Sequence, residues 1–360
     1  MSNKNPISVA FNRNLPESRL KFESWLQTQI PGVERLQVVH FDRPVSMGLS
    51  NELISADVEW LVDGQRQYGQ FMIRVDPVNY RKRRVSNLKR EFAVQKHLEG
   101  SRIPVVKMHW YCEDPDVLGA EFYVMQRMSG RVLSDDPPYS KEGWFADLDA
   151  AERRTVWLNA LKTMCLIHTA DPDEFVFLRR NNSDGLELQQ EVRHWRWTYE
   201  WATSGRPNPV AERGWAWLMQ NIPTDYPRGL CWGDAYPRNM MFEGLECIAV
   251  LDWEDVSLSS PLLDLARWLL ADRILAEWGY PRLEGVLEPS ELLSTWRMIT
   301  GYSDETLPWF QLLNYCAGAG NLARVERLQA EMFGKPVSAE ARSIEFLNSI
   351  ISEVLELVGA

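Results

Sequence analysis

Three polar residues stand out because their types and spacing suit phosphate chemistry. Asp234 is followed five positions later by Asn239, and two short apolar runs joined by a turn then lead to Asp252. Folding this segment back as a hairpin puts Asn239 and Asp252 nearly opposite each other, so two oxygen ligands share one small space. An amide oxygen and a carboxylate suit Mg²⁺, which keeps several waters and takes other ligands from phosphates. Asp234, on the loop before the hairpin, would face the same space, where it could orient a hydroxyl group and accept its proton.

The sequence around these residues is similar to a known family. The spacing resembles the catalytic loop and metal-binding Asp of protein kinases. The strings Trp232-Gly-Asp-Ala-Tyr-Pro-Arg-Asn239 and Leu251-Asp-Trp-Glu254 resemble the aminoglycoside phosphotransferase family. They are most similar to the branch whose members stand alone or are fused to acyl-CoA dehydrogenases. The resemblance implies that Asp234 is the catalytic base and that Asn239 and Asp252 hold Mg²⁺.

The segment after Asp252 extends the resemblance and also departs from it. The string Pro261-Leu-Leu-Asp-Leu-Ala266 is similar to the family's Pro-x-x-Asp-Leu-Ala. This similarity implies that Asp264 braces the catalytic loop by hydrogen bonds. Relatives often have Gly-Asp where this chain has Ser259-Ser260, and most have His where it has Trp232. The Trp leaves the base in place and changes what packs beneath the loop.

The first third of the chain is expected to form strands. Residues 51–62 alternate apolar and polar side chains, and Asp63-Gly64 is a strong signal for a hairpin turn. The next strand, expected over residues 69–75, carries Arg74 on the side opposite its apolar residues. An exposed Arg on an antiparallel sheet is one interpretation.

The resemblance gives Arg74 a second interpretation, as the residue that positions phosphates where kinases use Lys. An Arg can bind phosphate through two donors, but Arg and Lys are not interchangeable. A helix is expected over residues 86–99, with Ser86 as its N-cap. Glu91 in this helix would pair with Arg74 if the two side chains face each other.

Two further segments are expected to contact the nucleotide. Gly48 with Ser50 and Asn51 matches the Gly-x-Ser-Asn wording of the family, and backbone N–H groups in such a turn can hold phosphate oxygens. With a single glycine, an ordinary hairpin loop is equally consistent with this segment. Residues 126–130 resemble the linker between lobes, where adenine would hydrogen-bond to backbone near Gln126 and Met128.

Composition narrows the classes of function. A chain of 360 residues with 45% apolar content can bury a large core and suggests about two lobes. Its net charge of −11 argues against a nucleic-acid partner, because such binding depends on clustered Lys and Arg. Five cysteines without a CxxC pair are expected to be reduced thiols of a cytoplasmic protein. No signal peptide and no long apolar stretch is evident, so no membrane partner is expected.

The resemblance implies an α+β, bilobal protein-kinase-like fold. The N-lobe would be a small antiparallel sheet with one main helix, and the C-lobe would be larger and mostly helical. We expect an N-terminal helical extension at 1–35, a nucleotide-binding N-lobe at 36–128, and a C-lobe at 129–360. The last would carry the catalytic loop, the metal site and the substrate site.

The function indicated is an ATP- and Mg²⁺-dependent phosphotransferase acting on a hydroxyl of a small molecule. A hydroxylated acyl group or another lipophilic metabolite is favoured as acceptor, and an aminoglycoside is less favoured. Tryptophans in the helices expected at 186–203 and 210–221 could line such a site, or could simply pack in the core. His168, at the end of another helix, is interpreted as a packing residue.

The alternative is a non-catalytic protein of kinase-like fold that binds a nucleotide or metabolite. The observation in favour of this alternative is that Arg74 and Trp232 stand where the family usually has Lys and His. A protein kinase is disfavoured, because no activation segment ending in an Ala-Pro-Glu-like sequence follows Asp252. The sequence makes no prediction of the oligomeric state.

Overall fold

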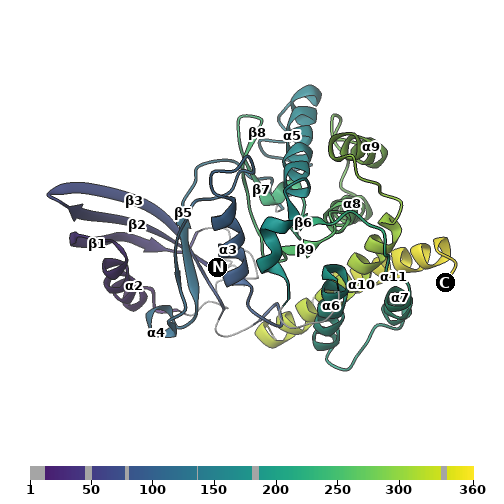
Figure 1. Ribbon diagram of the computed structural model, residues 1–360, viewed down its shortest axis with the longest axis horizontal. Coiled ribbons are helices and arrows are strands. Elements are labelled where there is room, and N and C mark those ends of the chain that lie inside the picture. Colours follow the sequence, from purple (N-terminus) through teal and green to yellow (C-terminus); the bar gives the residue numbers. More distant parts are fainter. Residues whose placement is uncertain (1–12, 45–50, 78–80, 136, 181–185, 334–338) are drawn as a thin grey trace. The chain divides into compact units, whose positions relative to one another are not determined.

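The computed structural model describes residues 13–44, 51–77, 81–135, 137–180, 186–333 and 339–360. The chain divides into two compact units. The first comprises Met1–Glu99, Val106–Ser129 and Arg327–Pro336, and the second comprises Gly100–Val105, Gly130–Glu326 and Val337–Ala360. The first unit is built on a sheet and the second is mostly helical, as the α+β prediction requires (Figure 1).

The sheet of the first unit has five strands in the order β1-β2-β3-β5-β4, and every neighbouring pair is antiparallel. The strands are β1 Val33–Asp42, β2 Glu52–Val62, β3 Gln65–Val75, β4 Met108–Cys112 and β5 Phe122–Gln126. Alternation determines which side chains are buried. In β3, Ile73 is fully buried, as the period of two predicts, and Arg74 lies on the other face. The predicted turn joins β2 to β3, with both Asp63 and Gly64 at positive φ.

Two helices cover opposite faces of this sheet. Helix α2, Leu15–Gln29, packs Phe22 and Leu26 into the core formed with β2 and β3. Helix α3, Leu88–Leu98, packs with Tyr123 on the other face of β5. A short helix, α4 Pro115–Leu118, precedes β5.

In α2, Leu20 is 55% exposed, whereas Phe22 is fully buried. The start of α3 differs from the prediction. Asn87 rather than Ser86 occupies the N-cap position of α3. Ser86 Oγ still accepts a hydrogen bond from the Leu88 N–H, at 3.4 Å.

The second unit consists of helices around two small hairpin-like sheets. Its α-helices are α5 Ala150–His168, α6 Glu187–Thr203, α7 Pro209–Gln220, α8 Leu262–Glu277, α9 Pro289–Thr300, α10 Leu307–Phe333 and α11 Ala339–Leu357. The last turns of α10 belong to the first unit. Two 3₁₀ helices, η1 Pro172–Leu178 and η2 Pro237–Asn239, complete the set. Its strands are β6 Gly229–Cys231, β7 Met240–Glu243, β8 Glu246–Val250 and β9 Ser257–Ser259, paired as β6 with β9 and β7 with β8. From Pro289 onward the described residues thus form the three helices α9, α10 and α11.

Core packing accounts for only some of the tryptophan side chains in helices α6 and α7. Trp215 of α7 is 1% exposed, and its ring centroid lies 5.7 Å from that of Tyr199 on α6. Trp197 of α6, in contrast, is 39% exposed. The surface of α6 thus offers aromatic area that the core does not use.

Two sequence expectations concern the chemical environment of the chain. All five cysteines carry free thiols, and four of them are buried. Among the residues that the structure describes, no helix combines the length and the apolar character needed to cross a membrane.

Candidate active site

The loop between β6 and β7 carries Asp234 and is fastened to helix α8. The carboxylate of Asp264, which is fully buried, accepts the N–H of Trp232 at 2.6 Å and the N–H of Gly233 at 2.7 Å. Two consecutive backbone donors are thereby satisfied by one side chain. This fixes the direction in which the loop presents Asp234, and it is the bracing contact that the resemblance implied for Asp264.

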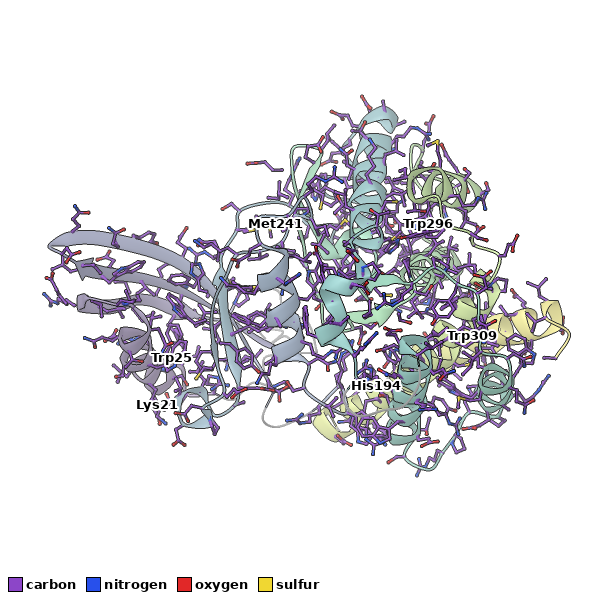
Figure 2. All side chains as sticks on the ribbon, in the orientation of Figure 1. Lys21, Trp25, His194, Met241, Trp296 and Trp309 are labelled. Carbon is purple, nitrogen blue, oxygen red and sulfur yellow. The ribbon has the colours of Figure 1, made fainter. Side chains whose placement is uncertain are left out.

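Asp264 is also part of a chain of side-chain hydrogen bonds that links three helices. His168 Nε2, at the end of α5, lies 3.1 Å from Asp264 Oδ2, and Trp296 Nε1 of α9 lies 2.9 Å from His168 Nδ1 (Figure 2 labels Trp296). An indole N–H can only donate, so Nδ1 must accept and the ring proton belongs on Nε2, facing Asp264. His168 is thus a packed residue, as predicted, but it also orients the carboxylate that holds the loop.

Gly233 allows the loop to pass close to the segment after Asp252. Its φ is +102°, and a Cβ at this position would lie 2.5 Å from backbone atoms of Asp255. No other residue type fits both the backbone angle and the contact. The glycine is therefore required by the loop's geometry.

Replacing this glycine gives a first prediction. Gly233→Ala should lower the free energy of unfolding by at least about 2 kcal/mol, because it combines an unfavourable φ with backbone overlap. Gly244→Ala is the matched control, since Gly244 also has a positive φ but has no atom within 4 Å of the point where its Cβ would lie. The control should cost only about 1 kcal/mol. Equal losses in urea unfolding of the two variants would show that the close contact is unimportant.

The predicted hairpin is formed by β7 and β8, with Met240 opposite Val250. Just beyond it, the Leu251 N–H donates to the Asn239 carbonyl at 2.8 Å. Asn239 therefore lies across from Leu251, one residue before Asp252, whereas the sequence analysis expected it nearly opposite Asp252 itself. Asp252 itself has a φ of +59°. A non-glycine residue in this region carries backbone strain, a feature that often accompanies functional sites.

Asn239 also ties the hairpin to the loop. Its Nδ2 donates to the Asp234 carbonyl at 2.9 Å and to Asp234 Oδ2 at 2.8 Å. The side-chain oxygen of Asn239 points away from these two bonds, because one amide presents its nitrogen and oxygen in different directions. The structure thus holds Asp234 and Asn239 together and leaves an amide oxygen for another partner.

Trp232 stands where the resemblance described above leads one to expect His. It is fully buried, and its Nε1 donates to the Leu251 carbonyl at 2.7 Å. The indole thus connects the loop to the residue before Asp252.

Arg267 contacts the predicted base and was not identified from the sequence. Its Nε and Nη2 lie 2.8 and 2.7 Å from Asp234 Oδ1. Arg267 follows Asp264 by three residues on α8, so one face of this helix supplies both contacts to the loop. That spacing is the one sequence signal that could have indicated it.

A buried polar chain anchors the residues that follow Asp234. The hydroxyls of Tyr139 and Tyr236 lie 2.7 Å apart, and Tyr236 donates to Asp272 Oδ1 at 2.9 Å. Arg282 binds the other oxygen of Asp272 at 3.2 Å. Burial raises the pKa of Asp272, although the charge of Arg282 opposes this. This chain also could not be predicted, because its members lie far apart in sequence.

In the first unit, the side chains of Arg74 and Glu91 face each other, which is the condition for their predicted pairing. Arg74 Nε lies 3.3 Å from Glu91 Oε2, and the Tyr123 hydroxyl donates to the same oxygen at 3.1 Å. Glu91 is 1% exposed, so its charge is buried and paired. The geometric condition for a phosphate-positioning pair is met, while that role itself stays a prediction.

The other nucleotide-binding predictions have less structural support. Gly48 and Ser50 lie outside the described residues, and Asn51 is half-buried just before β2. The Gln126 N–H already donates to the Lys107 carbonyl at 2.9 Å. A contact between adenine and Gln126 would therefore use another backbone group, and the parts of Gln126 and Met128 in adenine binding stay predictions.

Comparison with known proteins gives the site its context. Residues 54–294 match the phosphotransferase enzyme family. Over 267 residues the chain is 28% identical to acyl-CoA dehydrogenase family member 11 of Homo sapiens, a match covering 71% of this chain and 33% of that protein. The chain thus spans about a third of the length of this curated relative.

Two solved structures share the fold. One, from Ralstonia eutropha JMP134 and provisionally assigned as an aminoglycoside phosphotransferase, superposes with a TM-score of 0.66 at 20% identity, covering 94% of this chain and 97% of that chain. The other is a thermostable variant of aminoglycoside phosphotransferase APH(4)-Ia in complex with AMP-PNP and hygromycin B. It has a TM-score of 0.55 at 14% identity and covers 93% and 97% of the two chains. The α+β, kinase-like fold is thereby confirmed, and the chain belongs to the phosphotransferase enzyme family, in the branch related to the acyl-CoA dehydrogenase family members.

Proposed function

We propose that this chain is an ATP-dependent phosphotransferase that transfers the γ-phosphoryl group to a hydroxyl of a small molecule. The observation that carries the proposal is the pair of hydrogen bonds made by Asn239. One joins its side chain to Asp234, and the other joins its backbone to Leu251, next to Asp252. These contacts support the proposal, because phosphoryl transfer requires a base and oxygen ligands for the metal close together.

Each residue then has a defined part in an in-line transfer. The acceptor hydroxyl donates to Asp234, which orients it toward the γ-phosphorus and takes its proton. A bond forms between the acceptor oxygen and the γ-phosphorus, the bond to the bridging oxygen breaks, and ADP leaves. Arg74, held by Glu91, would contact the phosphates of ATP.

The donor set fits Mg²⁺. Asn239 offers an amide oxygen and Asp252 a carboxylate, both hard ligands, and two protein ligands suffice for an ion that keeps waters and phosphates. We propose that these two residues hold Mg²⁺, which when bound would offset the charge of the phosphates. Among the described residues no cluster of three or more His, Cys, Asp or Glu side chains could hold a metal ion.

For the acceptor, we favour a hydroxylated acyl group or another lipophilic metabolite over an aminoglycoside. The similarity to an acyl-CoA dehydrogenase family member supports this choice, although only part of that protein is matched. The exposed Trp197 on α6 supports it too, because a flat aromatic surface can bind an apolar chain. The five free thiols favour a reducing compartment, and we propose the cytoplasm.

Thermal unfolding with nucleotide tests the proposal. A ligand that binds only the native state, at about 100 times its Kd, adds roughly 2.7 kcal/mol to the free energy of unfolding. Mg²⁺-ATP should therefore raise the melting temperature clearly, and the rise should shrink in Asp252→Ala. A parallel series with Mg²⁺-GTP identifies the preferred donor.

The control is Asp225→Ala, which removes an exposed carboxylate between α7 and β6. This variant should respond to Mg²⁺-ATP as wild type does. If neither nucleotide shifts wild type at millimolar concentration, the chain is not a phosphotransferase of this kind.

A further inference from the structure

One side of helix α8 holds the loop that carries Asp234 at two places. Asp264 and Asp272 lie about two turns apart on this helix, so their side chains project from the same side. Asp264 accepts two backbone N–H groups of the loop just before Asp234. Asp272 accepts the hydroxyl proton of Tyr236, two residues after Asp234. The predicted base is therefore bracketed by two contacts with one helix.

Tyr236 is anchored through its ring as well as its hydroxyl. Its side chain is buried, and the ring packs edge to face against Trp157 and Trp268, with centroids 6.0 and 5.9 Å away. The hydroxyl lies 2.7 Å from that of Tyr139 and 2.9 Å from Asp272 Oδ1. Because Tyr236 donates its one proton to Asp272, it accepts from Tyr139. Both hydrogen bonds of the hydroxyl thus have a fixed direction.

The backbone of Tyr236 connects this anchor to the functional side chains. Its carbonyl accepts the Asn239 N–H at 2.9 Å, which closes the turn η2. Asn239 Nδ2 in turn donates to Asp234 Oδ2 at 2.8 Å. Displacing Tyr236 would therefore alter both the orientation of Asp234 and its distance from Asn239.

Stability alone does not account for polar groups at this place. The rings of Trp157 and Trp268 surround the hydroxyl-bearing ring of Tyr236 with apolar area. Burial raises the pKa of Asp272, even though Arg282 and the Tyr236 hydroxyl favour its charged form. Replacing a buried charge and its partners by apolar side chains of similar size is often neutral or stabilising. The network is better explained by the geometry that it gives to the loop.

We propose that Tyr236 and Asp272 are positioning residues for phosphoryl transfer, whose hydrogen bond holds Asp234 in the orientation that meets the acceptor hydroxyl. This inference rests on the proposed function, and it adds two residues that need not touch the nucleotide or the acceptor. An interaction of this kind affects the rate of transfer and leaves the binding of the nucleotide unchanged.

Tyr236→Phe tests the role, because it removes one hydroxyl and keeps the packed ring. ADP release from Mg²⁺-ATP, with water as the acceptor, should fall about 10- to 100-fold, the effect of a small misplacement of a catalytic group. KM for Mg²⁺-ATP should stay at the wild-type value. Without any nucleotide, backbone amides in the segment 232–241 should exchange hydrogen faster than in wild type, because the loop opens more readily.

Tyr199→Phe is the matched control. Tyr199, on α6, is also buried, and its hydroxyl accepts the Asn208 N–H at 2.9 Å. The control therefore loses a buried, hydrogen-bonded hydroxyl too, and both variants should lose stability in urea unfolding. Only Tyr236→Phe should slow ADP release and speed hydrogen exchange in the segment 232–241.

Asp272→Ala removes the same hydrogen bond from its other end. It should also slow ADP release at an unchanged KM for Mg²⁺-ATP. The variant that combines Asp272→Ala with Tyr236→Phe should be no slower than the slower of the two single variants, because either change alone removes the shared interaction.

Two outcomes would overturn the inference. One is that Tyr236→Phe matches Tyr199→Phe in ADP release and in hydrogen exchange, so that the hydroxyl serves stability alone. The other is that the losses of the two single variants multiply in the combined variant, so that Tyr236 and Asp272 act independently. The proposed function fails on a different measurement, the melting shift of wild type with Mg²⁺-ATP, and the two failures can therefore be distinguished.

Discussion

Asp234→Asn should lower the rate of phosphoryl transfer by roughly 100- to 10,000-fold, the usual contribution of a general base. The amide keeps the shape of the side chain and an oxygen for Asn239, but it cannot take up the hydroxyl proton. Because the contact with Arg267 is partly exposed, the free energy of unfolding should change by no more than about 1 kcal/mol. ADP release, nucleotide affinity and urea unfolding together measure these effects.

Turnover and nucleotide affinity, measured together, distinguish an enzyme from a non-catalytic binding protein. Loss of turnover with nucleotide affinity retained supports an enzyme in which Asp234 is the base. Asp304→Asn, a change at a surface pair with Arg297, controls for the chemistry of the substitution and should keep full turnover. Unchanged ADP release in Asp234→Asn would instead favour the non-catalytic binding protein of kinase-like fold.

Asp264→Ala should destabilise the protein by about 3 to 5 kcal/mol, the range for breaking a buried charged network. The substitution leaves the N–H groups of Trp232 and Gly233 and the Nε2 proton of His168 without their acceptor in a site closed to water. Each such donor carries a desolvation cost of its own. Denaturant unfolding at neutral pH measures the loss.

A surface carboxylate provides the comparison for this result. Asp304→Ala removes a partly exposed ion pair with Arg297 and should cost less than about 1 kcal/mol. A loss that small in Asp264→Ala would mean that water replaces the carboxylate, and that the relay through His168 does not hold the loop.

Much of the local structure was available from the sequence. Alternation in β2 and β3 predicted their buried face, and Asp63-Gly64 predicted the turn between them. The hairpin of β7 and β8 was likewise predicted from its turn, although Asn239 lies across from Leu251 rather than from Asp252.

Other features could not be predicted from local patterns. Leu20 and Phe22 both suit an apolar helix face, and only packing against the sheet decides that Phe22 is buried. The relay from Trp296 through His168 to Asp264 joins residues from three helices. Nothing in the neighbourhood of any one of them indicates the other two.

From the sequence alone came the fold class and the family, which its resemblance to the aminoglycoside phosphotransferase family implied, and the short spacings that single out Asp234, Asn239 and Asp252 for phosphate chemistry. The tertiary structure alone decided which side chains surround that set. It brought Arg267 into contact with Asp234, and it made a glycine necessary at position 233 by passing the loop against Asp255. Such contacts depend on how helices and loops pack in three dimensions, and packing is set by the whole core rather than by any one segment.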